Sequence, residues 1–437
     1  MEIWCLQSSW LCIHSPCRRR HKAAMIAEQN RMFCSRFLRR EAPAEWEVMM
    51  KDIYFIFRRE FYLVFRDHAV LTFFIFLCLG YPLIYTFIYS NEVVRQVPVA
   101  VIDQSKSPLS REFLRMWEAS PNVKVVAHCN DLGEAQLFMW QKEIYGILEI
   151  PADFSKDINR GEQAHVALFC DMGALLNYKA LLQATSDVAI TLGKEIQVEN
   201  LPYASRIQQE ITASPVEISE VKMFNPQSGF ASFIIPAVLI LVIQQSLLLG
   251  VGTIAGTARD RNPRHSLVPV DKHYCKPWCI VIGKACVYMP VYFVMGFWVF
   301  FIVPRIFSLT QIGAKSELML FLFPFLLACV FFAITASFFS REREQPFLLF
   351  VFTSVPLMFI SGISWPKEGI AGYWIALSKI FPSTHGIDGF VKMNNMGATL
   401  GEVLPEYLNL WILAIIYFIL ACLLYYREIV KSRKVRS

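Results

Sequence analysis

His385 and Asp388, in the segment PSTHGIDG, come nearest in this sequence to an acid–base pair. An imidazole and a carboxylate can exchange a proton with a substrate when both are held in a defined geometry. Here they follow Pro382 in a segment that glycine and proline repeatedly interrupt. We expect Pro382, His385 and Asp388 to form a turn in which the polar side chains hydrogen-bond locally, and we expect no catalysis there.

Motifs that mark nucleotide, metal or acyl-transfer sites are absent from the sequence. There is no G-x-x-x-x-G-K-[ST] loop for phosphates, no H-E-x-x-H for zinc and no G-x-S-x-G for a nucleophilic serine. We therefore expect no catalytic residue, no cofactor, no metal and no nucleic-acid partner. Any work that the chain performs must then draw its energy from another protein.

A charged run, RDRN at 259–262, follows two small residues, Gly252 and Gly256, that stand four positions apart. Small residues at this spacing allow two helices to approach closely. The run is either a basic anchor at a membrane surface or a surface that contacts a partner, and its spacing does not separate the two interpretations. Lys284 lies one turn inside the next apolar run, where its long side chain can reach back toward water.

The composition is typical of a membrane protein. The chain has 437 residues, of which 55% are hydrophobic and 18% are charged, and its mean hydropathy is +0.40. Soluble domains usually contain about 25% charged residues. These figures disfavour an ordinary soluble enzyme and exclude a disordered chain. The 12 cysteines are too few for a disulfide scaffold.

Six apolar runs are each candidates to cross a bilayer, which takes roughly 20 residues of helix. The runs are 69–89, 230–254, 280–303, 318–339, 347–365 and 407–426. We therefore predict an α-helical multi-pass membrane protein with six transmembrane helices. A charge at mid-membrane costs about 2.5–3.5 kcal/mol, and five of the six runs contain none.

The distribution of Lys and Arg predicts the orientation, because cytoplasmic loops carry an excess of both. The first 68 residues contain 12, and the segments 255–279, 340–346 and 427–437 together contain another 12. The alternate loops, 304–317 and 366–406, contain five. We expect both termini in the cytoplasm, with 255–279 as a cytoplasmic loop and 427–437 as a cytoplasmic tail. Segment 91–228, with 12 basic and 18 acidic residues, then lies outside.

Segment 91–228 predicts an α/β extracytoplasmic domain between transmembrane helices 1 and 2. Apolar β-branched runs at 98–103, 123–128, 145–150 and 165–170 alternate with helical patterns. Such alternation is typical of small α/β domains. Cys129 and Cys170 each lie at the end of a predicted strand, and they are either two separate thiols or a disulfide.

The N-terminal region divides at about residue 50. Residues 1–50 form a basic extension without the apolar run that is typical of a signal peptide. We expect either a disordered extension or a segment upstream of the true start, for which Met49 or Met50 is a more natural position. Residues 51–68 carry charged pairs on one face of a helix and Ile and Phe on the other. This pattern favours an amphipathic helix in the membrane interface; the alternative is a cytoplasmic extension of the first span.

The order of these segments resembles that of the permease subunits of ABC type-2 exporters, over about residues 51–435. The outer segment contains VAVIDQSKSPLSREF and YGILEIPADFSKDINRGE, both similar to that family's outer domain. GTARDRNPRHSL precedes a span that contains GK, and SREREQPFLLFVFTSVPLMFISGISWP leads to KIFPSTHGIDGF. The resemblance implies that 366–406 forms re-entrant half-helices, with Gly369, Gly372, Pro382, Gly386 and Gly389 as breaks. It differs in one place, because the family's Glu-rich pattern after the second span is missing here.

The resemblance also implies partners and contact residues. An ABC ATPase subunit would dock on the interfacial helix and on the loop after the second span. The residues implied in this contact or in coupling are Arg58, Arg59, Thr257, Arg259, Asp260, Arg261, Asn262 and Arg264. A second copy of the permease, or a paralogous permease chain, would complete the pathway in the lipid membrane. A periplasmic adaptor is a further partner that the resemblance leaves open.

The function expected from these observations is that of the permease subunit of an ATP-driven exporter in the bacterial cytoplasmic (inner) membrane. The apolar spans contain no chain of ionisable groups, which disfavours proton or sodium coupling and favours an amphiphilic, drug-like or lipid-like substrate. The alternative is a membrane receptor or envelope-assembly factor that senses through its outer α/β domain. A membrane enzyme is disfavoured because the spans contain no polar constellation.

Overall fold

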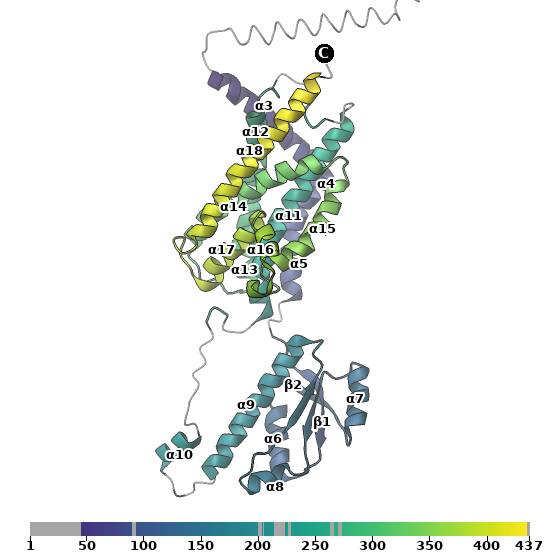
Figure 1. Ribbon diagram of the computed structural model, residues 1–437, viewed down its shortest axis with the longest axis vertical. Helices are drawn as coiled ribbons and strands as arrows, with labels where there is room; N and C mark the ends of the chain where they lie inside the picture. The colour runs from purple at the N-terminus through teal and green to yellow at the C-terminus, as the bar shows by residue number, and fades with distance from the viewer. Residues whose placement is uncertain are drawn as a thin grey trace, which may run out of the picture. The chain divides into compact units, whose positions relative to one another are not determined.

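The computed structural model describes residues 45–89, 93–199, 203, 205–213, 223–225, 229–262, 266–269 and 273–434. These residues fall into two compact units. The helical unit combines the chain up to residue 90 with the chain from residue 231 onward, and the α/β unit comprises 91–230 (Figure 1). The α/β unit is therefore inserted in the sequence between the first and second long apolar helices.

The α/β unit alternates strands and helices as the sequence predicts. In chain order it contains β1 (Val97–Asp103), α6 (Pro108–Glu118), β2 (Val123–His128), α7 (Leu132–Trp140), β3 (Gly146–Ile150), α8 (Phe154–Asn159), β4 (Ala167–Cys170), α9 (Leu175–Glu199) and α10 (Arg206–Ala213). Helix α6 begins with a capping box, in which the Ser107 hydroxyl accepts from Ser110 N at 3.0 Å. Asp131 caps α7 by accepting from Gly133 N at 3.2 Å.

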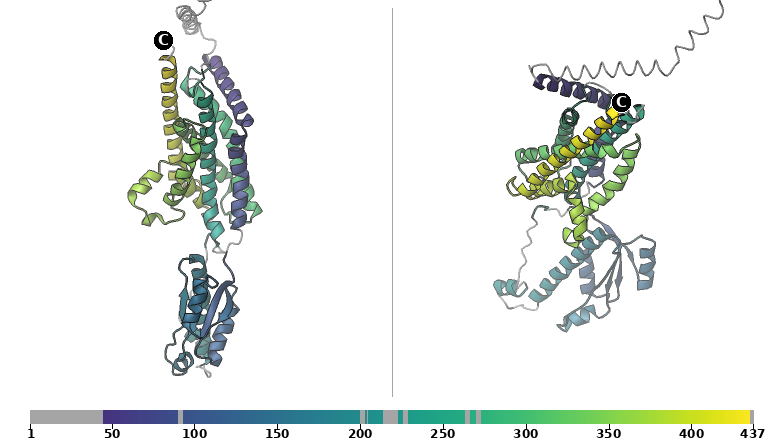
Figure 2. Two further views of the ribbon diagram at one scale, coloured as in Figure 1. Left: turned by 90° about the vertical axis from the view of Figure 1, so that its right-hand side faces the viewer. Right: turned by 45° about the horizontal axis from the view of Figure 1, so that its top comes forward.

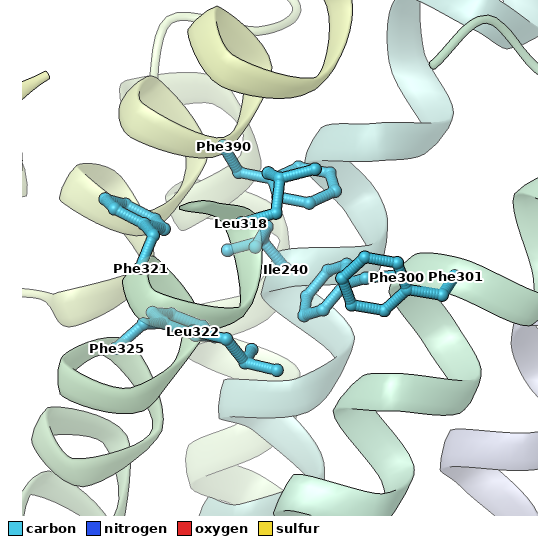
Figure 3. A pocket seen from close by; sticks show the side chains of 8 residues that line it. All are labelled: Ile240, Phe300, Phe301, Leu318, Phe321, Leu322, Phe325 and Phe390. Carbon is cyan, nitrogen blue, oxygen red and sulfur yellow. The ribbon is translucent and has the colours of Figure 1, made fainter. Parts of the chain in front are cut away.

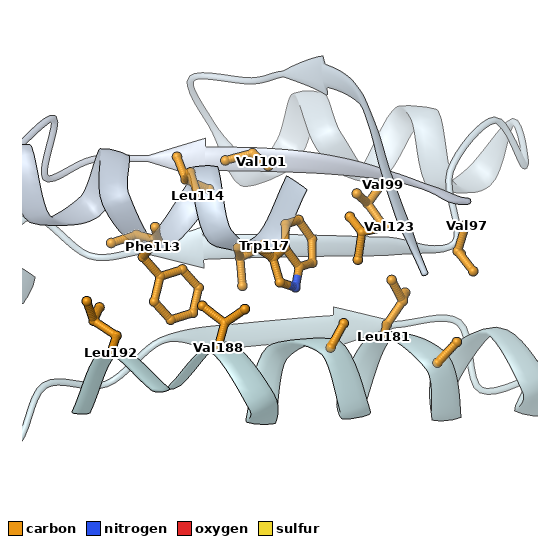
Figure 4. Packing of buried hydrophobic residues seen from close by; sticks show 14 of the residues in the cluster. Val97, Val99, Val101, Phe113, Leu114, Trp117, Val123, Leu181, Val188 and Leu192 are labelled. Atoms are coloured by element: carbon orange, nitrogen blue, oxygen red, sulfur yellow. The ribbon is translucent and has the colours of Figure 1, made fainter. Parts of the chain in front are cut away.

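The four strands form one sheet in the order β2-β1-β3-β4. Strand β1 runs parallel to β2 and β3, whereas β4 runs antiparallel to β3. Because side chains alternate across a strand, Val99 and Val101 face the core formed with α6 and α9, while Ala100 and Ile102 face α7. Figure 4 shows the larger core, with Trp117 of α6 at its centre.

Cys129 and Cys170 are free thiols in the structure, which argues against the predicted alternative of a disulfide. Cys129 directly follows β2, and Cys170 ends β4, so the two lie at opposite edges of the sheet. Three strand spacings separate these edges, or roughly 14 Å, whereas the Cα atoms of a disulfide lie at most about 7 Å apart. Burial raises the pKa of both thiols, which lowers their reactivity further.

The helical unit contains the remaining elements. In chain order these are α3 (Glu45–Arg66), α4 (His68–Leu71), the π-helical turn η1 (Thr72–Phe76), α5 (Leu77–Ile88), α11 (Phe230–Arg261), α12 (Pro277–Phe297), the π-helical turn η2 (Trp298–Ile302), α13 (Val303–Ile306), α14 (Lys315–Ala336), η3 (Ser337–Phe339), α15 (Gln345–Ile360), η4 (Lys367–Gly369), α16 (Gly372–Ser378), α17 (Pro382–Met396) and α18 (Leu404–Lys434). Helix α11 is the core of this unit, since nearly all of its side chains are buried.

Five helices among the described residues are long and apolar enough to cross a membrane, against the six that the sequence predicts. They are His68–Ile88, Phe230–Arg261, Pro277–Ile306, Lys315–Phe339 and Leu404–Lys431. The remaining predicted span, 347–365, is mostly α15, a helix of 16 residues that extends for about 24 Å. It ends early because Gly362 adopts a left-handed conformation (φ +86°), which the uninterrupted apolar run did not reveal.

Several predicted boundaries also differ from the structure. Helix α11 continues to Arg261, so the predicted loop 255–279 begins as helix, and α18 likewise continues into the predicted tail. Gly386 and Gly389, expected as breaks, lie inside the unbroken helix α17. A Cβ atom at either glycine would approach a Phe ring to within 2.6 Å, so these glycines allow α17 to pack closely on α14. Of the predicted extension 1–50, only 45–50 is described, and it is helical.

Candidate functional site

Helix α3 is a separate element that packs along α12 (Figure 1). It ends at Arg66, and Asp67 begins α4 by accepting from Ala69 N at 3.1 Å. Its buried side chains recur every four residues at Asp52, Ile56, Glu60 and Val64. The buried face of α3 thus carries two carboxylates beside its apolar side chains, so charged and apolar residues do not divide between the two faces of this helix as predicted. Figure 2 shows α3 at the same end of the helical unit as the C-terminal part of α18.

Glu60 forms an ion pair with Lys284 of α12, with 2.8 Å between Lys284 Nζ and Glu60 Oε1. The Tyr288 hydroxyl donates to the same carboxylate. Only 3% of the Glu60 side chain and 13% of the Lys284 side chain are exposed. Lys284 therefore does not reach toward water as predicted, because a carboxylate from α3 meets it inside the protein. Gly283 makes this approach possible, since a Cβ there would lie 2.8 Å from Ile56 Cγ2.

Two further contacts join α3 to the segment just before α12. Asp52 Oδ1 lies 2.6 Å from His273 Nδ1, and Phe55 stacks on the same imidazole at 4.3 Å. The Arg59 guanidinium lies over the Tyr274 ring, 5.5 Å from its centre. Burial, together with the nearby Glu60, raises the pKa of Tyr274 to about 12, so its hydroxyl stays neutral at physiological pH. Helix α3 thus contacts the 273–288 region at three points along its length.

Arg259 joins the end of α11 to two other parts of the helical unit. Its Nη1 donates to the Ser340 carbonyl at 2.8 Å, and its Nη2 lies 3.8 Å from Glu428 Oε1 on α18. The Ser266 hydroxyl donates to the same carboxylate at 3.3 Å. Arg259 is 7% exposed, so it lies inside the protein and not on a surface that a partner could reach.

Arg343 forms a junction of three elements next to Arg259. Its Nη2 pairs with Asp67 Oδ1 at 2.7 Å, and its Nη1 donates to the Thr257 hydroxyl at 3.3 Å. The backbone of this segment crosses α11 at Gly256, where a Cβ would lie 2.4 Å from the Glu342 carbonyl oxygen. Close contact at Gly252 and Gly256 was predicted from their spacing, and the structure has it against residues 340–346.

The residues predicted for the ATPase contact divide into two groups. Arg58, Arg59, Asp260 and Arg261 are exposed, Asn262 is half-buried, and Arg264 lies outside the described residues. Thr257 and Arg259 are buried and bind other parts of this chain. The exposed residues are available to a partner, whereas the buried two can act only by positioning the segments they join. We call the region formed by α3, residues 257–262 and 273–288, residues 340–343 and the end of α18 the basic end.

The residues expected in a turn lie instead in the helix α17, and each contacts a different partner. Pro382 occupies the first turn of α17, where its missing N–H has no cost. His385 Nε2 lies 3.1 Å from the Lys379 carbonyl oxygen, whereas Asp388 pairs with Lys367 Nζ at 2.5 Å. His385 and Asp388 therefore do not form an acid–base pair with each other. Among the described residues no group of His, Cys, Asp and Glu could hold a metal ion.

A polar layer in the middle of α11 was not identified from the sequence. Gln244 Oε1 accepts from Ser383 N at 2.7 Å, Gln245 Nε2 donates to Thr353 of α15 at 3.3 Å, and Ser246 Oγ accepts from Tyr292 at 3.0 Å. Three consecutive residues thus reach three different helices. The sequence does contain a signal for this layer, the polar residues QQS inside the apolar run ILVIQQSLLLG. Buried polar side chains within a membrane span often mark a functional site.

Long apolar helices around a buried central helix, with a charged helix packed at one end, define a multi-pass membrane protein. The chain belongs to the ABC-2 family of transporter proteins, since the model of the family described as ABC-2 family transporter protein matches residues 68–423. It is therefore a permease of the ABC transporter class. No protein of curated function matches the chain.

Proposed function

We propose that this permease is the membrane subunit of an ATP-driven exporter and that a separate ABC ATPase subunit supplies the energy. The observation that carries this proposal is the basic end, where the buried pair Glu60–Lys284 binds α3 to α12, and where Arg343 joins Asp67, directly after α3, to Thr257 of α11. A helix joined in this way moves together with the spans that it contacts. Movement imposed on α3 by an ATPase would therefore reach α11 and α12.

The exposed residues of the basic end are the proposed docking surface for the ATPase. Arg58 and Arg59 present positive charge on α3, and Asp260 and Arg261 lie exposed at the end of α11. Charged groups at the rim of an interface set its register and its association rate. The buried Thr257 and Arg259 then act behind this surface as positioning residues.

We further propose six crossings, with both termini in the cytoplasm and the α/β unit outside. The basic residues that precede the first span and follow the last span support this arrangement. It places the highly charged N-terminal segment and the tail on the same side of the membrane. An even number of crossings then requires α15 to cross as well. At about 24 Å it is shorter than a bilayer core, and short helices cross by thinning the membrane locally.

The polar layer around Gln244 is the proposed lining of the substrate pathway, which a second permease copy or a paralogous chain would complete. Gln244 Nε2 and Thr384 Oγ1 are buried without a hydrogen-bond partner among the described residues. The apolar surroundings of these groups favour an amphiphilic, drug-like or lipid-like substrate. A periplasmic adaptor would contact the α/β unit.

Affinity purification of the full chain from native membranes tests this proposal. The exporter proposal expects an ATPase subunit in stoichiometric amount, and export must stop when that ATPase is deleted. The alternative, a receptor or assembly factor, expects a signalling or envelope partner in its place. Recovery of such a partner with no ATPase would refute the exporter proposal.

A further inference from the structure

A pocket of about 460 Å³ lies where α12 and α14 approach each other near the connection 304–317. Phe297, Phe301, Ile306 and Met319 supply apolar lining, and Arg305 and Lys315 supply two positive charges. Its volume lies within the range of roughly 300–1,000 Å³ that is usual for small-molecule sites. The pocket is therefore apolar along most of its wall and cationic at two points.

The two cations of this pocket are exposed, and no acidic residue in the described part of the chain pairs with them. Arg305 and Lys315 are the only basic residues of the connection 304–317, and both line the pocket. Neither forms a hydrogen bond or an ion pair with another described residue. The acid of the same connection, Glu317, is engaged elsewhere, since its Oε2 accepts from Leu400 N at 2.6 Å. No acidic residue lines the pocket.

A π-helical turn shapes the pocket wall. The turn η2 spans Trp298–Ile302, and Phe301 belongs to it. Turns of this kind occur often at functional sites, since they shift side chains out of the regular helical register. Gln311 Nε2 donates to the Phe300 carbonyl at 2.7 Å, and so satisfies an acceptor that lies within this turn. Figure 3 shows Phe300 and Phe301 at a second, much smaller apolar cavity, which shares Phe301 with this pocket.

We propose that this pocket binds an anionic phospholipid, with its phosphate between Arg305 and Lys315 and the upper part of an acyl chain against Phe297, Phe301 and Met319. Guanidinium and ammonium groups bind phosphate through charge-assisted hydrogen bonds. Phe297 and Ile306 are exposed, so a lipid can enter from the side. The inference requires that α12 and α14 cross a membrane, and it is independent of the direction of transport and of the cargo.

Native mass spectrometry of the full chain, purified with its bound partners in a neutral detergent, tests the proposal. Phosphatidylglycerol should bind more tightly than phosphatidylcholine of the same chain length. The double variant Arg305→Gln/Lys315→Gln should weaken phosphatidylglycerol binding about tenfold and leave phosphatidylcholine binding unchanged. Lys379→Gln, which removes an exposed positive charge outside the pocket, is the matched control and should bind like the parent protein.

A second variant tests the contribution of the cavity's shape separately from that of its two positive charges. Met319→Trp fills the cavity and keeps both cations, so it should also weaken phosphatidylglycerol binding, with an unchanged unfolding temperature. Equal binding of the two lipids by the parent protein, or full binding by the double variant, would overturn the proposal. So would equal competition by soluble glycerol phosphate, which has the headgroup charge without the chain, or a crosslink from position 306 to a second copy of the chain.

Discussion

Glu60 on α3 and Lys284 on α12 form an ion pair of 2.8 Å across two elements that are more than 200 residues apart in sequence. Tyr288 donates to the same carboxylate, so each charge is compensated although little of either side chain is exposed. A pair of this kind fixes the position of one helix on another, because separating the charges leaves one of them buried alone.

Removing one member of this pair should destabilise the protein strongly. We expect Lys284→Met alone to lower the free energy of unfolding by about 3–5 kcal/mol, because it leaves the Glu60 carboxylate uncompensated. The double variant Glu60→Leu/Lys284→Met should recover much of that loss. Thermal unfolding in detergent measures both, with Arg58→Gln on the exposed face of α3 as the control. A single variant that is no worse than the double variant would show that the pair is not coupled.

Gly256→Ala should disturb the basic end because the added Cβ has no room. It would lie 2.4 Å from the Glu342 carbonyl oxygen, a backbone atom that cannot turn aside. We expect the crossing segment to shift, and transport to fall at least severalfold while insertion continues. Gly193→Ala in α9 is the matched control, since beyond its own helix backbone and chain neighbours no described atom would lie within 4 Å of the added Cβ, and it should be neutral or stabilise by up to about 1 kcal/mol. Equal activity of the two variants would count against the crossing.

The exposed charges at the end of α11 should govern association with the ATPase. Reversing both, in Asp260→Lys/Arg261→Glu, should weaken co-purification of the ATPase about tenfold or more, because like charges then face each other across the interface. Membrane insertion should not change. The control reverses an exposed pair of the α/β unit, Glu112→Lys/Arg115→Glu. Unchanged co-purification would remove Asp260 and Arg261 from the proposed docking surface.

Cysteine labelling tests the proposed orientation. In a variant without its native cysteines, a cysteine at the exposed position Asn159 in α8 should react with an impermeant maleimide added outside the cell. A cysteine at Ser432, near the end of α18, should react only after the membrane is opened. The reverse pattern would invert the orientation, and labelling of both positions from outside would imply an odd number of crossings.

The sequence predicted the α/β unit well because its signals are local. The strand at 123–128 has the predicted bounds, and a helix follows it as predicted. Period-two alternation and side-chain caps depend on neighbouring residues alone, so they can be interpreted without tertiary information. The same holds for five of the six apolar runs, each of which corresponds to a long apolar helix.

What the sequence did not reveal depends on contacts between distant residues. Lys284 looked like a side chain that reaches for water, because nothing nearby in sequence announces Glu60 as its partner. Gly386 looked like a helix break, whereas it is the place where α17 meets Phe325. Likewise, Arg259 belongs to a charged run, yet Glu428 and Ser340 enclose it. Each of these residue types can have two different roles in a protein, and in each case the tertiary surroundings determine which role the residue has.

ATP hydrolysis by the full chain in lipid nanodiscs, measured alone and together with its co-purified ATPase, tests the central claim most directly. The sequence has no phosphate-binding loop, so we predict no turnover above background from the chain alone and sustained turnover from the complex. Hydrolysis by the chain alone at the rate of the complex would contradict the claim that this permease takes its energy from a separate subunit.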